Sequence, residues 1–166
     1  MVGNNEEKFA LQTSRFGEIV VDVSKKIDII GGLLGFPDSK RFIVLDHEQN
    51  SPFKWLQSID EGEVAFVICD PLVFFPDYRL QIRKEELANM KVESIEDFVI
   101  FVILSLYGGI NDMTANLQGP IIVNAKHRKG RQIVLKNSGY KTRHRLFPDV
   151  EKEIEAATED IDKSGG

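Results

Sequence analysis

Chemically reactive side chains are scarce in this sequence of 166 residues. Its one cysteine, Cys69, excludes an internal disulfide, and its place at the end of an apolar run is typical of a buried core thiol. The three histidines, His47, His127 and His144, lack partners at the spacing of metal ligands. Asp46 and Glu48 flank His47, but adjacent residues on a strand point to opposite faces and cannot converge on an ion. We therefore expect no metal and no other cofactor.

Catalytic motifs are missing as well. The sequence contains no Gly-x-Ser-x-Gly elbow, no Walker loop and no Gly-x-Gly-x-x-Gly after a strand. A nucleophile pair of Cys69 with His47 would need an exposed thiol, at a position where the pattern predicts core. These gaps predict a protein that is not an enzyme.

Long apolar runs are the third absence. The longest, Phe98–Tyr107, is about half of what a bilayer-spanning helix requires. Residues 1–11 carry three charges, Glu6, Glu7 and Lys8, where a signal peptide would have an apolar core. With 42% hydrophobic and 28% charged residues, the composition is that of a soluble globular domain. We expect a cytoplasmic protein without membrane contact, monomeric when free.

Charge is present but unevenly distributed. Residues 1–125 hold 19 acids and 11 bases (net −8), residues 126–148 hold 8 bases and no acid (+8), and residues 149–166 hold 7 acids and 2 bases (−5). Such blocks favour interaction with charged partners over catalysis.

Short stretches of alternating or β-branched residues, separated by turn signals, predict nine to eleven strands without βαβ alternation. The main predicted strands are Phe16–Val23, Ile27–Ile30, Arg41–Asp46, Phe53–Ile59, Val64–Cys69, Arg79–Arg83, Phe98–Tyr107, Ile121–Ala125 and Gln132–Leu135. Phe98–Tyr107 is predicted to be buried on both faces, and Lys84–Met90 to be helical. The predicted fold is all-β and mainly antiparallel, a small β-barrel-like domain with one or two short helices and a C-terminal acidic helix.

Three segments follow from these patterns. Residues 1–12 show no sustained period and are predicted to be a flexible N-terminus. Residues 13–147 are predicted to form the single barrel-like domain. Residues 148–166 are predicted to form an acidic helix with a thin apolar stripe and a frayed tail.

The stretch Ser51–Tyr78 holds the only Trp and the only Cys of the chain. It predicts a hairpin with an acidic turn, residues 60–63, and with Trp55, Phe66 and Cys69 inside the barrel. The segment that follows lies between two prolines, which cannot donate hydrogen bonds to a sheet ladder. Its aromatic residues, Phe74, Phe75 and Tyr78, belong either to the core or to an adhesive surface patch.

A basic stripe offers an alternative function. It consists of Lys126, Arg128, Lys129, Arg131, Lys136, Lys141, Arg143 and Arg145. Such a stripe can bind phosphates, so the chain could bind RNA directly through residues 126–145. Only one aromatic residue, Tyr140, is interleaved with these cations, whereas single-strand binders offer several stacking platforms. A solvated hairpin tip is the plainer interpretation, and we expect no direct contact with nucleic acid.

Five ordered motifs give a resemblance to a known family. They are Gly32–Pro37, Ser51–Ser58, Asp70–Pro71 with Phe75–Tyr78, Met113–Leu117 with Gly119–Ile121, and Ser138–Tyr140 with Arg143–His144. In this order and spacing the sequence resembles the bacterial flagellar assembly factor FliW, over residues 16–147.

The resemblance implies a small β-barrel-like cytoplasmic factor that binds two proteins in alternation. One is flagellin, held before secretion, and the other is CsrA, an RNA-binding translational repressor. Export of flagellin would free the factor to bind CsrA and relieve repression of flagellin translation. We hypothesise that the CsrA contact includes Asp60, Glu61 and Glu63 of the acidic turn, with Phe74, Phe75 and Tyr78.

Overall fold

The structure, a computed structural model, describes residues 7–147. Its strands are β1 (Lys8–Thr13), β2 (Gly17–Asp22), β3 (Ile27–Ile29), β4 (Arg41–Asp46), β5 (Phe53–Ser58), β6 (Ala65–Cys69), β7 (Phe98–Ser105), β8 (Thr114–Ala115), β9 (Ile121–Asn124), β10 (Lys129–Gln132) and β11 (His144–Arg145). The helical turns are α1 (Pro71–Phe74) and four 3-10 turns, η1 (Val23–Lys25), η2 (Lys84–Leu87), η3 (Ile95–Asp97) and η4 (Ile110–Asp112). None of the helices within this part of the chain is long and apolar enough to cross a membrane.

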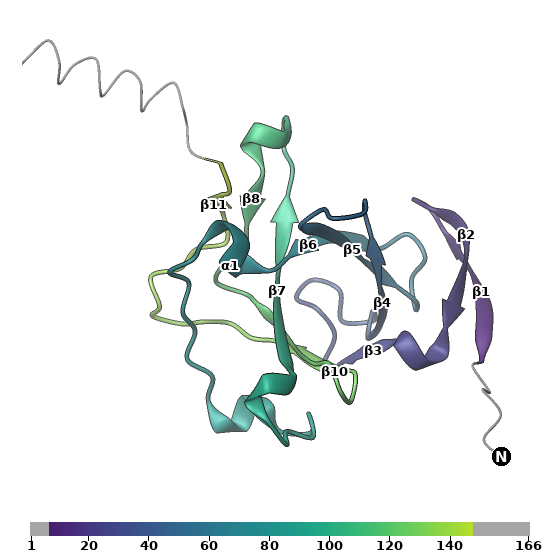
Figure 1. Ribbon diagram of the computed structural model, residues 1–166, viewed down its shortest axis with the longest axis horizontal. Helices are drawn as coiled ribbons and strands as arrows, with labels where there is room; N and C mark the ends of the chain where they lie inside the picture. The colour runs from purple at the N-terminus through teal and green to yellow at the C-terminus, as the bar shows by residue number, and fades with distance from the viewer. Residues whose placement is uncertain (1–6, 148–166) are drawn as a thin grey trace, which may run out of the picture.

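Seven strands close into a barrel. They follow the order β7-β6-β5-β4-β3-β10-β9, and β9 pairs back with β7 to complete the ring (Figure 1). Every pair in the ring is antiparallel except β3 with β10. The short strands β8 and β11 extend the sheet beyond β7. The prediction of an all-β, mainly antiparallel barrel is confirmed.

The barrel interior is filled from all sides by alternate residues of its strands. Its fully buried members are Ile27, Ile29, Leu33, Phe42, Leu56, Ile68, Ile121 and Val123. Phe66 packs against them from β6, as predicted. Cys69 is buried but lies on the other face of β6, because it is an odd number of residues from Ile68 and Phe66. Its predicted place inside the barrel is wrong.

A second core lies outside the barrel wall. The outward residues of β6, β7 and β9, such as Cys69, Val102 and Ile122, pack there against the segment that runs from α1 to Met90. In Figure 1 this segment passes beside β7. Because β9 lies between the two cores, all four of its residues are buried. An outer layer without strands therefore covers part of the barrel.

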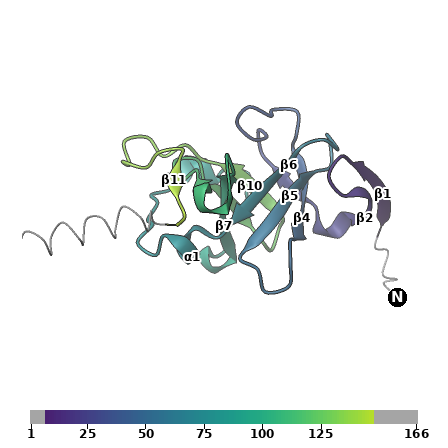
Figure 2. The same cartoon turned by 90° about the horizontal axis from the view of Figure 1, so that it is seen from above.

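The hairpin of β1 and β2 forms a separate sheet that packs on the outside of β4 (Figures 1 and 2). Phe9 and Leu11 of β1 contact a small third core there, with Ile43 of β4. The predicted flexible N-terminus is therefore wrong for residues 8–12: their alternation of apolar Phe9 and Leu11 with small or polar residues is that of a half-buried strand.

Trp55 also lies outside the barrel, against the tip of this hairpin. The guanidinium of Arg15 lies 4.5 Å from the centre of its ring, and the ring of Phe16 meets it edge-on at 5.4 Å. Trp55 is only half-buried. Its predicted place in the barrel interior is wrong, since the outward face of β5 is covered by a hairpin that the sequence pattern did not predict.

Three further predictions need correction. Residues 79–83 pair with no strand of the described chain, although Leu80 and Ile82 do pack inward while the polar residues that alternate with them are exposed. The predicted helix over residues 84–90 is reduced to the single turn η2. β7 is not buried on both faces, because Val99 is 39% exposed. The predicted acidic helix after Phe147 lies outside the described residues.

Candidate partner-binding surface

The segment after β6 turns away from the sheet at Asp70. The Asp70 carboxylate accepts a hydrogen bond of 2.9 Å from the backbone N–H of Leu72, which caps the first turn of α1. Pro71 occupies the first helical position, where its missing N–H costs no hydrogen bond. These two residues end β6 and begin α1.

Phe74 and Phe75 are half-buried and hold α1 against the second core. Phe74 stacks on Phe53 of β5, with ring centres 5.6 Å apart, and meets Phe147 edge-on at 5.7 Å. Phe75 packs edge-on against His144. Burial, and then the charge of Lys141, lower the pKa of His144, which favours the neutral form of its ring. Both phenylalanines therefore have part of their surface engaged inside the protein.

Tyr78 is a core residue, so the hypothesis that it forms a surface contact is wrong. It is 4% exposed, and its hydroxyl donates a hydrogen bond of 2.7 Å to the carbonyl of Leu117. Burial, and then the neighbouring Tyr140, raise the pKa of its phenol well above the ordinary value. The exposed large hydrophobic residues of this segment are instead Leu72 and Val73, at 50% and 57%. Sequence reasoning missed both, because aliphatic residues beside aromatics give no separate signal.

Two of the three acids in the acidic turn have internal partners. Asp60 accepts hydrogen bonds of 2.8 Å from the backbone N–H groups of Lys40 and Arg41 and from the Arg41 guanidinium. Desolvation raises the pKa of the Asp60 carboxyl, but these hydrogen bonds outweigh it and leave the pKa below its ordinary value. The Glu61 carboxylate accepts a hydrogen bond of 2.8 Å from the hydroxyl of Ser39. The third acid, Glu63, is exposed.

The acidic turn and the aromatic segment do not form one surface. In the β5–β6 hairpin, Gln57 pairs with Ala65 next to the turn, whereas Phe53 pairs with Cys69 next to Asp70. Four residues separate these pairs, so the two regions are at least about 13 Å apart along the strands. The turn lies near the β1–β2 hairpin, where Ser14 donates to the carbonyl of Gly62, and α1 lies by β7 (Figure 1).

The basic stripe is also divided. Lys126 and His127, at the tip of the β9–β10 hairpin, both pair with Glu93, at 2.7 and 2.8 Å. Arg143 lies over the ring of Tyr107, and Arg145 pairs with Asp112 at 3.5 Å. These two groups lie at opposite ends of β7. The first residue of β7 pairs with Asn124, next to the hairpin tip. The last residue pairs with Thr114, which also pairs with Arg145.

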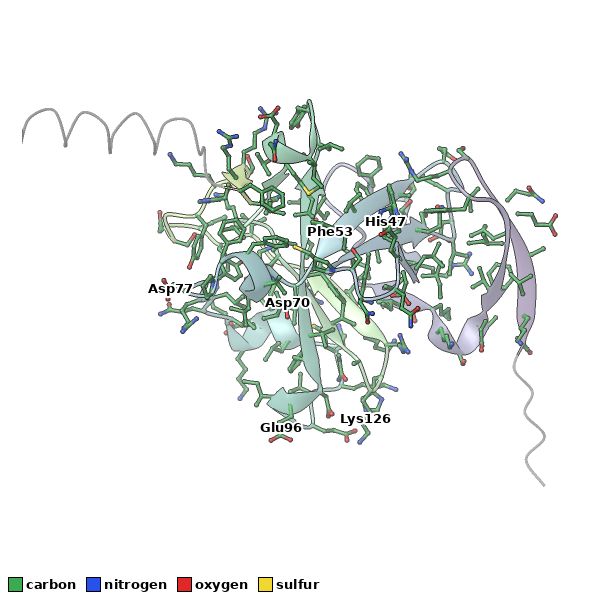
Figure 3. The ribbon with its side chains drawn as sticks, turned by 45° about the horizontal axis from the view of Figure 1, so that its top comes forward. His47, Phe53, Asp70, Asp77, Glu96 and Lys126 are labelled. Carbon is green, nitrogen blue, oxygen red and sulfur yellow. The ribbon has the colours of Figure 1, made fainter. Side chains whose placement is uncertain are left out.

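Acids neutralise part of each half of the stripe, and β7 separates the halves by its eight residues, roughly 25 Å. In Figure 3, Lys126 lies at the far end of β7 from β11. The geometry does not favour an RNA-binding surface.

Metal binding receives no support from the described residues, 7–147, which contain no cluster of three His, Cys, Asp or Glu side chains that could hold an ion. His47 (Figure 3) instead accepts a hydrogen bond of 3.3 Å from the indole of Trp55 through Nδ1. Burial, and then the charge of Asp70, raise the pKa of the Cys69 thiol to about 12, which removes its nucleophilic form at neutral pH.

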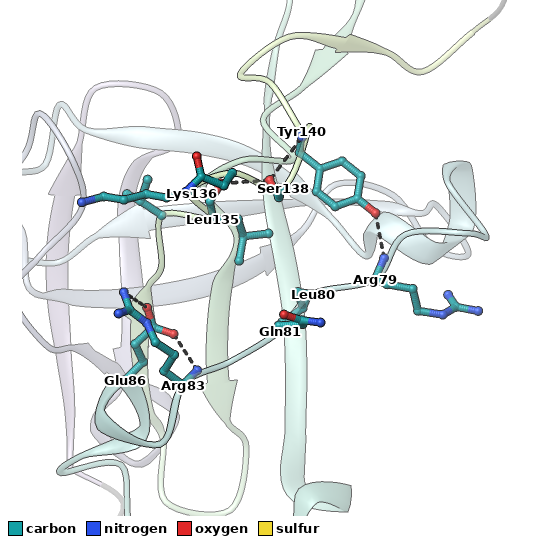
Figure 4. Close-up of a pocket in the computed structure, with 11 residues that line it drawn as sticks. Arg79, Leu80, Gln81, Arg83, Glu86, Leu135, Lys136, Ser138 and Tyr140 are labelled. Carbon is teal, nitrogen blue, oxygen red and sulfur yellow. Dashed lines mark hydrogen bonds and ion pairs between the residues drawn. The ribbon is translucent and has the colours of Figure 1, made fainter.

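Two grooves lie beside residues 79–83. The first, of about 650 Å³, is polar and carries Arg79, Arg83 and Lys136 (Figure 4). Its polar groups are partly satisfied within the protein: the Tyr140 hydroxyl accepts from the Arg79 N–H at 2.9 Å, and the Glu86 carboxylate from the Arg83 N–H at 3.0 Å. The second groove, of about 720 Å³, is apolar and runs along β7. It is the larger recess and the less polar one.

Comparison with known proteins covers nearly the whole chain. Residues 10–146 match the family described as FliW protein. The flagellar assembly factor FliW of Caldanaerobacter subterraneus subsp. tengcongensis is 42% identical over 141 residues, 84% of this chain and 94% of that protein. The namesake from Alkaliphilus metalliredigens is 35% identical over 143 residues, 86% of this chain and 88% of that protein. A crystal structure of the flagellar assembly factor FliW superposes with a TM-score of 0.79 at 33% identity, covering 85% of this chain and 99% of that one.

Proposed function

The chain belongs to the FliW family of flagellar assembly factors, and on this premise we propose that it binds flagellin and, when free of flagellin, the translational regulator CsrA. Binding of CsrA weakens its hold on RNA and so relieves repression of flagellin translation. Both partners are met in the cytoplasm, and the mechanism is an exchange of partners without catalysis. Family membership over residues 10–146 is the observation that carries this proposal.

The surface chemistry supports binding in place of catalysis. The only thiol of the chain is buried with a raised pKa. Large hydrophobic side chains nevertheless remain exposed, among them Leu72, Val73 and Ile95. Exposed apolar groups beside a groove are typical of surfaces that contact other proteins.

Charge supports CsrA as one of the partners. The net charge of −8 over residues 1–125 suits docking onto a basic RNA-binding protein, because opposite charges steer the encounter and the acids oppose RNA nearby. Among the three acids of the turn we propose Glu63 as the principal contact, because it is exposed while Asp60 and Glu61 accept hydrogen bonds within the protein.

Isothermal titration calorimetry with purified flagellin and purified CsrA, each added alone, tests the proposal. Saturable binding to both is expected. A parallel titration with RNA alone at physiological salt is the control for the alternative, and no heat is expected there. Absence of binding to either protein, or RNA binding without CsrA, would contradict the proposal.

A further inference from the structure

The first half of β7 has a strand partner on one edge only. Residues 98–101 pair with β9, and residues 102–104 pair with β6 on the opposite edge. β6 ends at Cys69, which pairs with Val102. Beyond that pair, no strand of residues 7–147 lies along the β6 side of residues 98–101.

The register shows which backbone groups face this open edge. The N–H of Ala125 donates to the carbonyl of Asp97 at 2.8 Å, so Asp97, Val99 and Phe101 direct their backbone groups towards β9. The N–H and the C=O of Ile100 therefore both point towards the open edge. The C=O of Phe98 points the same way. The N–H of Phe98 is already used, since it donates to Ile95. One donor and two acceptors remain.

Pro71 explains why β6 does not continue. Extending the pairing of Cys69 with Val102 by two residues would place Pro71 opposite Ile100. Proline has no N–H to donate to the ladder. With Asp70 capping α1, the chain leaves the sheet at this point. The sequence itself thus ends the β6–β7 ladder at the pair Cys69–Val102. Ile100 is left without a partner strand on this edge.

The open edge forms one wall of the apolar groove. Besides residues 98–101, the lining includes Leu72 of α1, Leu80 and Ile82 of the covering segment, and Ile95. Ile95 is 83% exposed, Leu72 50% and Val99 39%. The volume, about 720 Å³, is within the range of roughly 300–1,000 Å³ found for ligand sites. Unpaired backbone groups and exposed aliphatic side chains therefore occur in one recess.

We propose that this groove binds an extended segment of a partner protein, which adds to β7 as an antiparallel strand in the place that β6 leaves empty. The segment's residue opposite Ile100 accepts from the Ile100 N–H and donates to the Ile100 C=O. A residue two positions further on donates to the C=O of Phe98. Apolar side chains at alternate positions of the segment contact Leu72, Val99 and Ile95.

The charges of the lining bear on the possible occupants. Two cations, Lys54 and Arg79, line the groove with one carboxylate, Asp70. Lys54 already pairs with Asp46 at 2.6 Å, so Arg79 is the cation that an acidic residue of the segment can meet. The chain's own residues 148–166 alternate polar and apolar residues over four positions at most, 153–156, and these lie within the predicted acidic helix. The proposal relies on the proposed function only for the premise that the partners are proteins.

Residue-resolved amide hydrogen exchange of the full chain is the test. In the free protein, the Ile100 amide should exchange at least about 100-fold faster than those of Val99 and Phe101, which are bonded to β9. The probe is an acetylated, amidated heptapeptide that alternates valine with threonine and begins with aspartate. Its addition should slow exchange at Ile100 tenfold or more and leave Val99 unchanged.

Two matched controls isolate the mechanism. The same peptide with N-methyl groups on alternate amides retains its side chains but cannot form the ladder, so it should not protect Ile100. Leu72→Asp should weaken peptide binding at least about tenfold, whereas Val73→Asp, on the same turn but outside the groove lining, should leave it unchanged. Both side chains are at least half exposed, so neither change disturbs the core.

Several outcomes would overturn the proposal. Equal protection of Ile100 and Val99 in the free protein would do so, and so would equal binding by the N-methylated peptide. Fast exchange at Ile100 that appears only after removal of residues 148–166 would assign the groove to the chain's own tail. Protection that rises with protein concentration would assign it to a second copy.

Flagellin and CsrA, added separately, link the groove to the proposed function. Displacement of the peptide by either protein, with protection of Ile100, supports both proposals. If both proteins bind without protecting Ile100 or displacing the peptide, the groove proposal fails and the proposed function stands. If neither protein binds but the peptide does, the proposed function fails and the groove proposal stands.

Discussion

The hydroxyl of Tyr78 donates a hydrogen bond of 2.7 Å to the backbone carbonyl of Leu117, 39 residues further along the chain. Both residues are buried in the second core. The bond ties the segment after α1 to the loop before β9, and so fixes the outer layer that forms one side of the apolar groove.

Removal of this hydroxyl should therefore destabilise the protein. Tyr78→Phe leaves the Leu117 carbonyl buried without its partner, at a cost of about 1–2 kcal/mol in the free energy of unfolding. Urea denaturation followed by tryptophan fluorescence measures the change. Tyr107→Phe is the matched control, because Tyr107 is 67% exposed. This substitution should lower the free energy of unfolding by less than about 0.5 kcal/mol. Equal costs for both variants would contradict the structural role of Tyr78.

Asp60 should make stability depend on pH. Its pKa is lowered in the folded protein by hydrogen bonds from Lys40 and Arg41, which outweigh desolvation. A lowered folded pKa stabilises the protein above the unfolded pKa, about 3.9, and this contribution is lost as the pH falls through the folded pKa. Asp60→Asn should lower the free energy of unfolding by about 1 kcal/mol at pH 7. This is below the usual contribution of hydrogen bonds to a charged group, because the carboxylate is partly hydrated.

The difference between Asp60→Asn and the unchanged protein should shrink below about pH 4, as measured by denaturation at a series of pH values. Glu63→Gln provides the comparison, since that side chain is exposed and its removal should be neutral at every pH. A pH-independent cost for Asp60→Asn would show that its charge is not what the hydrogen bonds stabilise.

Cys69 should be chemically silent in the folded state. With its pKa raised to about 12 by burial and by the charge of Asp70, almost no thiolate exists at pH 8. Reaction with Ellman's reagent should be at least about 100-fold slower than that of a free thiol, and complete once the protein is unfolded. Rapid labelling of the native protein would show that the end of β6 opens to solvent.

Glu63 should contribute to the rate at which CsrA binds. Glu63→Lys should slow association by roughly twofold or more at low salt, and the difference should fade as salt screens the charges. Glu85→Lys makes the same charge change at an exposed site on η2, on the side of the barrel away from the acidic turn (Figure 1), and should have little effect. Stopped-flow fluorescence measures both rates, and identical slowing by the two variants would contradict a local role of the turn.

Local pattern was sufficient for the central hairpin, although not for β1 or for residues 79–83. The hairpin predicted at 53–59 and 64–69 is observed at 53–58 and 65–69, because alternation and an acidic turn specify it locally. Closure of the barrel was beyond such patterns, since it depends on β3 pairing in parallel with β10 and on β9 pairing with β7. Those contacts join segments remote in sequence.

The candidate site shows the same limit. The prolines around residues 71–76 correctly placed that segment outside the ladder, but burial of Tyr78 depends on Leu117 and the engagement of Asp60 on Arg41. Neither partner is near in sequence. The signal for the open edge was Pro71, and its meaning required the register that sets it opposite Ile100.

The central claim, exchange of partners, is tested most directly by fluorescence anisotropy of a labelled flagellin leader RNA bound to CsrA. Adding this chain should lower the anisotropy as CsrA releases the RNA, and subsequent flagellin should restore it by drawing the chain away from CsrA. Anisotropy that the chain leaves unchanged, or that flagellin fails to restore, would contradict the account.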